Sequence, residues 1–274
     1  MESMSHHGSM GGSTLLLVLL VILPALLLCL YLIAAVRLRK RSRWSLWRIA
    51  SYSAGTGLII AAMLPPLAIW AHQDLRGHMV QHLFLGMFGP LGLVFGAPGT
   101  LLLRSIPPLA ARRVMSFLNV RPVRFLIHPV TAALLDIGGM YLLYLTPLYL
   151  YCMSHPGMFI FLHLHFVLSG YLFTWSIAGP DPAPRRPGWV TRLSVVFVAT
   201  AAHAVLGKLM FAYGYPQGTA ASLTEIQSAA QWMYYGGDLA EFLLIVGFFA
   251  MWFRRKSALP AAFGGESPAS LSVK

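Results

Sequence analysis

The sequence predicts an all-α, polytopic membrane protein, a bundle of seven transmembrane helices with its N-terminus outside the cytoplasm and its C-terminus in the cytoplasm. Of 274 residues, 57% are hydrophobic and 10% are charged, whereas a soluble domain carries about 25% charged residues. Seven Trp and eleven Tyr suit helix anchors at membrane–water interfaces. The net charge is +12, but its short clusters between apolar runs argue against a nucleic-acid partner.

A helix needs about 20 residues to cross the hydrocarbon core of a bilayer. Seven apolar segments meet that length, and in chain order we expect the spans at 14–36, 49–70, 79–103, 129–151, 157–178, 193–213 and 229–253. The first run lacks a basic leader and ends in a strongly basic stretch, so it is interpreted as a span rather than a signal peptide. Pro65-Pro66, Pro90 and Pro147 lie inside spans and are expected to kink them.

Basic residues set the predicted orientation. The loops after the first, third and fifth spans, together with the C-terminal tail, hold 18 of the 20 Lys and Arg residues. The positive-inside rule places that side in the cytoplasm. We therefore expect an extracytoplasmic tail over 1–13, one membrane domain over 14–256, and a disordered cytoplasmic tail over 257–274 that is rich in Ala, Pro, Gly and Ser.

Ionisable residues inside spans are costly and mark candidate functional positions. Five of them are histidines predicted in the outer half of the membrane, on the third, fifth and sixth spans: His78, His82, His163, His165 and His203. His78 and His82 share a helix face, whereas His163 and His165 should point to opposite faces. Imidazole is a good copper ligand, and thioether sulfur selects Cu(I). This set, with Met and His residues on the outer surface, suits a copper site and its entry route.

Structural roles compete with each of these interpretations. His78 and His82 would also serve as interfacial helix caps, and His203 as an interhelical hydrogen-bond partner. Asp136 and Asp238 are functional or simply polar contacts between helices. The seventh span carries a polar face with 4-3-4-3 spacing, which must point into the bundle: Gln227, Gln231, Tyr234, Asp238 and Glu241.

Catalytic signatures such as H-E-x-x-H, the Walker loop and G-x-S-x-G do not occur in the sequence, and we expect no enzymatic activity. Several short strings occur in a fixed order: His78-Met-Val-Gln-His82, Gly96-Ala-Pro98, His128-Pro129, His163-Leu-His165-Phe166, Gly179-Pro-Asp181-Pro182, Ala202-His203 and Gly236-Gly237-Asp238. In this order and topology, the chain from about residue 50 to 256 resembles the multi-spanning CtaG-type cytochrome c oxidase assembly factors.

The resemblance implies an assembly factor of the bacterial cell (inner) membrane that supplies copper to, or stabilises, the catalytic subunit of a haem–copper oxidase. It matches His78, His82, His163, His203 and Asp238. We hypothesise that His78, His82 and His203 are the Cu(I) ligands, with His163 as a fourth ligand or support and Asp238 orienting a histidine or balancing charge. The expected partners are the oxidase subunit, an extracytoplasmic copper donor and the lipid bilayer; a homodimer is left open.

In the seventh span the family often has Gln-x-Gly-Gly, then Trp and a Gly-Glu pair. This chain has Gln227-Ser-Ala229-Ala230, then Tyr234 and Gly237-Asp238, so the target oxidase is not identified. Three alternatives stay open: a copper or proton transporter that uses the intramembrane acids, a haem-binding membrane protein with a bis-histidine pair, and a scaffold whose histidines only hydrogen-bond between helices.

Overall fold

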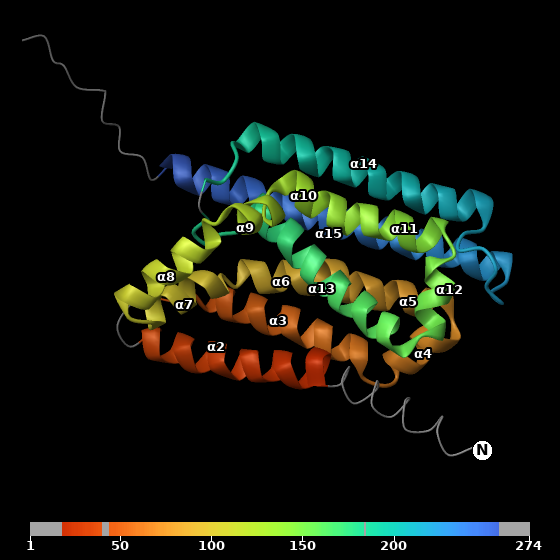
Figure 1. Ribbon diagram of the computed structural model, residues 1–274, viewed down its shortest axis with the longest axis horizontal. Helices are drawn as coiled ribbons and strands as arrows, with labels where there is room; N and C mark the ends of the chain where they lie inside the picture. Colours follow the sequence, from red (N-terminus) through yellow and green to blue (C-terminus); the bar gives the residue numbers. More distant parts are fainter. Residues whose placement is uncertain (1–17, 40–43, 184, 258–274) are drawn as a thin grey trace, which may run out of the picture.

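The computed structural model describes residues 18–39, 44–183 and 185–257, and over these residues all regular secondary structure is helical, without strands. Long helices lie side by side along one direction (Figure 1). In chain order the elements are η1 (Val18–Ile22), α2 (Leu23–Arg39), α3 (Leu46–Met63), α4 (Leu67–Gln73), α5 (Leu75–His82), η2 (Leu83–Phe88), α6 (Gly89–Phe95), α7 (Pro98–Ser105), α8 (Pro108–Leu118), α9 (Arg121–Leu126), α10 (Pro129–Ala133), η3 (Leu134–Gly138), α11 (Gly139–Leu145), α12 (Leu148–Ser154), α13 (Pro156–Ala178), α14 (Trp189–Tyr213) and α15 (Leu223–Ser257).

Among the described residues, four helices are long and apolar enough to cross a membrane: Leu75–Phe95, α13, α14 and a segment of α15. Two bent pairs raise the number to six if each pair is one span. The prediction of an all-helical, multi-spanning chain is confirmed, whereas the count of seven and the orientation of the termini stay predictions. The start of the first expected span, the tail 1–13 and residues 258–274 lie outside the described residues.

The expected proline kinks are present at two of three places. The helix axis turns by 51° between α3 and α4 at Pro65-Pro66, and by 86° between α11 and α12 at Pro147. Pro90 does not interrupt its span. Proline has no N–H to bond the carbonyl four residues earlier, which here is the Gly86 carbonyl. The turn that contains Gly86 is the π-helical η2. The Gly86 carbonyl instead faces Gly170 of α13, where any Cβ would overlap it.

The third span differs from its predicted bounds of 79–103. It begins at Leu75 and ends at Phe95, because Ala97 adopts the left-handed conformation with φ of 54°. L-residues rarely continue a helix in that conformation. Pro98 then begins the separate helix α7, which takes up the apolar residues that follow. The prediction that this apolar run is helical is confirmed, but the run forms more than one helix.

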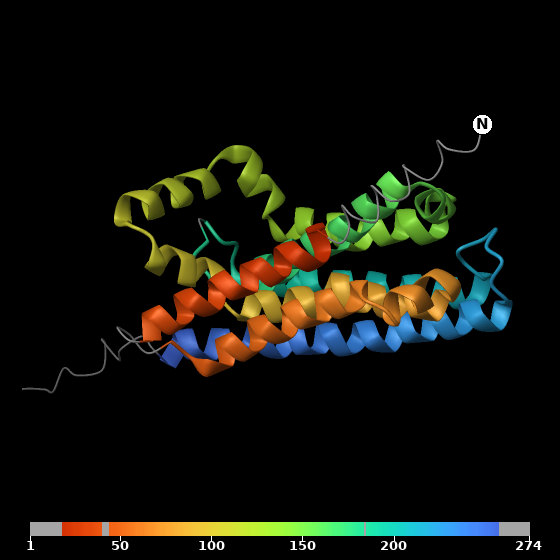
Figure 2. The same ribbon diagram turned by 90° about the horizontal axis from the view of Figure 1, so that it is seen from below.

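The two ends of the bundle differ in character. Helices α7, α8 and α9 lie at the same end as the start of α14 and the end of α15, whereas α4 and α12 lie at the other (Figure 1). Neither α8 nor α9 has a buried residue, and both stand off the side of the bundle (Figure 2). We call the end that carries α7–α9 and the loop 179–188 the basic end, and the other the opposite end.

Two strings of the sequence pattern meet at the basic end. The buried Asp181 carboxylate accepts hydrogen bonds from the Gly99 N–H at 3.0 Å and from the Thr100 N–H and hydroxyl, both at 2.6 Å. Asp181 thus satisfies the first free N–H groups of α7, which have no partner within that helix. The contact ties the loop after α13 to α7 and fixes the two relative to each other.

Candidate functional site

The candidate site is a set of buried polar side chains between α5, α13, α14 and α15. Its members are less than 9% exposed although they lie in an apolar bundle: His78, Gln81, His82, Asp136, His163, Ser169, His203 and Glu241. Buried polar groups need hydrogen-bond partners, and an unsatisfied one costs about 1–3 kcal/mol. The partners of each group therefore separate the residues that hold the bundle together from those that are available for chemistry.

His78 and His163 belong to the first kind. The His78 Nε2 atom lies 3.2 Å from the Tyr144 hydroxyl of α11. Gln81 donates its amide N–H to the Ala62 carbonyl at 2.8 Å, which leaves its oxygen facing the His163 Nε2 atom at 3.1 Å. The His163 Nδ1 atom lies 2.7 Å from the Phe159 carbonyl. Each ring nitrogen of His163 thus faces an acceptor oxygen, and the single N–H of the neutral ring donates to one of the two.

His82 and His203 belong to the second kind. His82 is 2% and His203 is 0% exposed, and neither ring has a hydrogen bond on either nitrogen. The His82 ring packs against Phe166 at a centroid distance of 4.6 Å and against Gly86 of the next helical turn. An imidazole has one donor and one acceptor when neutral, so both rings leave their full hydrogen-bonding capacity unused.

An acid lies beside His203. The Glu241 Oε1 atom is 3.5 Å from the His203 Nδ1 atom, which suits an ion pair but is longer than the usual 2.7–3.2 Å of a hydrogen bond. The Thr200 hydroxyl also lies near the Glu241 carboxylate, without a well-aligned hydrogen bond between them. We call these two imidazoles and this carboxylate the His82–His203–Glu241 group.

Two glycines of α15 allow this group to assemble. A Cβ at Gly236 would overlap the Leu83 side chain, which directly follows His82, and a Cβ at Gly237 would overlap the His203 ring. Small residues let membrane helices approach closely. The Gly236-Gly237 pair therefore lets α15 pack closely against two neighbours. The third span next to His82 packs against Gly236, and His203 of α14 packs against Gly237.

Two predicted positions lie apart from that group. Asp136 is hydrogen-bonded to the Ser169 hydroxyl at 3.0 Å, within the π-helical η3. Asp238 is only partly buried, and the carboxylate beside His203 belongs to Glu241 instead. The 4-3-4-3 polar face of the seventh span contained both acids, but their sequence spacing did not show which one meets a histidine. His165 points away from His163, as expected, and contacts the Leu135 carbonyl at 3.0 Å.

Across the described residues, no group of three or more His, Cys, Asp or Glu side chains is arranged to hold a metal ion. The expected ligand set of His78, His82 and His203 therefore does not appear as a preformed three-ligand cluster. The three histidines differ in their hydrogen bonding: His78 contacts the Tyr144 hydroxyl, whereas His82 and His203 form no hydrogen bond. Copper binding and the role of Asp238 stay predictions.

Comparison with known proteins gives a family and a small set of relatives. The model of the cytochrome c oxidase caa3 assembly factor family (Caa3_CtaG) matches residues 29–255. An uncharacterized protein of Mycobacterium bovis is 33% identical over 181 residues, or 64% of this chain, and one of Mycobacterium leprae is 31% identical over 185 residues, or 65%. The chain spans only 27% and 28% of their respective lengths. No solved structure matches. The chain belongs to the cytochrome c oxidase caa3 assembly factor family.

Proposed function

We propose that the protein assists the assembly of a haem–copper oxidase by holding Cu(I) at His82 and His203 and releasing it to the catalytic subunit. The observation that carries the proposal is a pair of buried imidazoles that form no hydrogen bond at any of their four ring nitrogens, although His203 faces Glu241 at 3.5 Å. Family membership supplies the assembly role, and the histidine pair supplies a reason for copper.

A buried polar atom without a partner is destabilising, and a chain that keeps several such atoms gains stability by binding a ligand that satisfies them. Imidazole nitrogen is a good ligand for copper. Two protein ligands leave the ion accessible to a third donor, as a delivery protein requires. The Glu241 carboxylate, 3.5 Å from His203, would balance the charge of the bound ion.

The other matched histidines take supporting roles in this proposal. His78 holds the third span against Tyr144, and His163 holds it through Gln81. Both contacts fix the rotation of α5, which carries His82 one turn beyond His78. Residues behind the ligands commonly set their orientation and affinity for metal. Loss of either contact should therefore weaken copper binding without removing a ligand.

The setting of the site suits transfer within the membrane. His82 lies on the span Leu75–Phe95 and His203 on α14, which is also a candidate span. A donor site at this depth would pass the ion sideways to an acceptor subunit without exposing it to water. The proposed transfer takes place in the bacterial inner membrane. An extracytoplasmic copper donor supplies the ion, and the oxidase subunit accepts it.

The test measures copper bound to the full-length protein purified in detergent and loaded with Cu(I) under reducing conditions. Elemental mass spectrometry should find about one copper per chain in the wild type, since two histidines offer a single site. The variant His82→Ala/His203→Ala should lose it. The control His72→Ala/His155→Ala removes two exposed histidines and should keep it.

Two results would count against the proposal. If the site variant and the control retain the same copper, the histidine pair is not the ligand set. If the wild type binds no copper at any loading, the protein assists assembly as a scaffold without carrying copper. The two imidazoles then lower its stability and no bound ion offsets that loss.

A further inference from the structure

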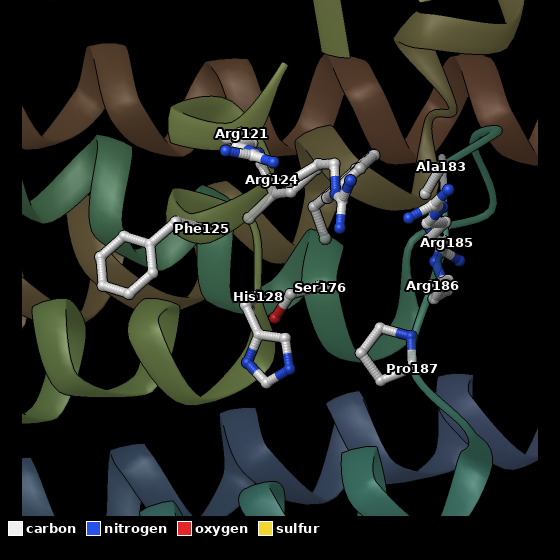
Figure 3. Close-up of a pocket in the computed structure, with 11 residues that line it drawn as sticks. Arg121, Arg124, Phe125, His128, Ser176, Ala183, Arg185, Arg186 and Pro187 are labelled. Atoms are coloured by element: carbon white, nitrogen blue, oxygen red, sulfur yellow. The ribbon is translucent and has the colours of Figure 1, made fainter. Parts of the chain in front are cut away.

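We propose that a pocket at the basic end binds the phosphate headgroup of an anionic phospholipid. The pocket has a volume of about 280 Å³ and lies between α9, the end of α13 and the loop that leads into α14. Figure 3 shows the α9 arginines above His128 and the loop arginines on the other side. The residues that carry the argument are Arg121, Arg124, His128, Trp175, Arg185 and Arg186.

Three of the arginines that line this pocket have no ion pair among the described residues. Within residues 18–39, 44–183 and 185–257, the structure shows no ion pair for Arg121, Arg124 or Arg185. The acid of the adjoining loop, Asp181, is occupied by the start of α7. Like charges held together repel, so an anion in the pocket would be favoured by several guanidinium groups at once.

Two further side chains shape the pocket. Arg186 donates to the carbonyls of Gly179 and Asp181 and lies 5.2 Å from the centre of the Trp175 ring, so it forms a fixed charged wall. The His128 Nδ1 atom accepts the Val130 N–H at 3.3 Å, as the cap of α10. A neutral imidazole with Nδ1 as acceptor carries its proton on Nε2, which leaves a directional donor for a phosphate oxygen.

The position of the pocket favours a lipid over a soluble anion. It lies where α10 and α14 begin and α13 ends, and these elements are membrane spans or parts of them. Beside it, α8 and α9 expose large apolar side chains although they also carry arginines. Leu109, Phe117, Phe125 and Leu126 are 45–67% exposed. An amphipathic helix of this composition lies in the headgroup region, and basic pockets at span ends bind anionic headgroups.

The test uses the full-length protein in nanodiscs of phosphatidylcholine doped with a spin-labelled phosphatidylglycerol. The motionally restricted fraction of the label reports lipid held by the protein. Wild-type protein should hold the label in preference to a labelled phosphatidylcholine. The variant Arg124→Gln/Arg185→Gln should bind it about 30-fold more weakly, from the contribution of each arginine near an anionic surface.

The control Arg112→Gln/Arg113→Gln removes the same charge from α8, outside the pocket, and should change binding much less. Equal losses in the two variants would show diffuse attraction to the surface and overturn the proposal. Displacement of the label by millimolar inorganic phosphate would assign the pocket to a soluble anion and also overturn it. Size-exclusion profiles that match the wild type establish that both variants are folded.

Discussion

Replacing His82 with leucine is expected to stabilise the copper-free protein, which is the reverse of the usual effect of a change in a buried position. Both ring nitrogens of His82 are unpartnered, and Phe166 and Gly86 surround the ring with apolar groups. An unsatisfied buried polar group costs about 1–3 kcal/mol, and leucine of similar size removes that cost. A gain of this size raises the melting temperature of a chain this long by about 2–5 °C.

The assay is thermal unfolding in detergent, with and without Cu(I). Without copper, His82→Leu should melt above the wild type. With Cu(I) at about 1,000 times its dissociation constant the order should reverse, because bound copper then stabilises the wild type by about 4.1 kcal/mol and the variant has lost a ligand.

His163→Leu is the matched control, since this histidine is equally buried but its N–H has an acceptor, the Phe159 carbonyl or the Gln81 side-chain oxygen. It should melt below the wild type, because that buried oxygen loses its donor. If His82→Leu and His163→Leu destabilise alike, His82 has a structural partner in the protein and the reasoning from its unused nitrogens fails.

Two further predictions concern the supports of the site. Gly237→Ala should lower stability by about 1–3 kcal/mol through overpacking and reduce copper loading, because its Cβ overlaps the His203 ring. In the same melting and copper assays, Gly57→Ala, where no atom lies within 4 Å of the new Cβ, should leave copper loading unchanged and should not lower stability, because alanine is the better helix former. Asp181→Asn should cost about 1–3 kcal/mol in thermal melts while leaving copper content unchanged, because only the tie to Thr100 and its neighbour is weakened. A loss of copper in Asp181→Asn would show that the basic end controls the site.

Much of the architecture follows from hydropathy alone, because runs of about 20 apolar residues have few alternatives to a helix in a bilayer. The kinks at Pro65-Pro66 and Pro147 also follow from the sequence, since proline lacks the helical N–H. The end of the third span does not follow from the sequence, because nothing in the composition indicates the left-handed conformation of Ala97. Apolar residues on both sides of that break concealed it.

The sequence indicated that His78, His82, His163 and His203 lie inside the bundle, but not which side chains they meet, and their role as metal ligands stays a prediction. Spacing placed His78 and His82 on one helix face, and the structure keeps both buried. Which of them finds a partner depends on Tyr144, which approaches from another helix. The choice between Asp238 and Glu241 likewise depends on how α15 is rotated against α14. Sequence periodicity defines a face of a helix but not its neighbour.

The basic pocket shows the same limit for charges. Arg121 and Arg124 lie in one basic loop and Arg185 and Arg186 in another, and the positive-inside rule uses such residues only as a count. Their convergence on a single pocket requires the tertiary arrangement of α9 against the end of α13. Charge counting therefore predicted a side of the membrane but could not predict this pocket.

The most direct test of the central claim is the copper-to-haem ratio of the haem–copper oxidase isolated from cells that lack this protein and carry back either the wild type or His82→Ala/His203→Ala. The account predicts oxidase with normal haem and a copper deficit in the variant strain, with normal copper in the wild type and in the control His72→Ala/His155→Ala. Fully copper-loaded oxidase in the variant strain, at equal levels of the assembly protein, would contradict it.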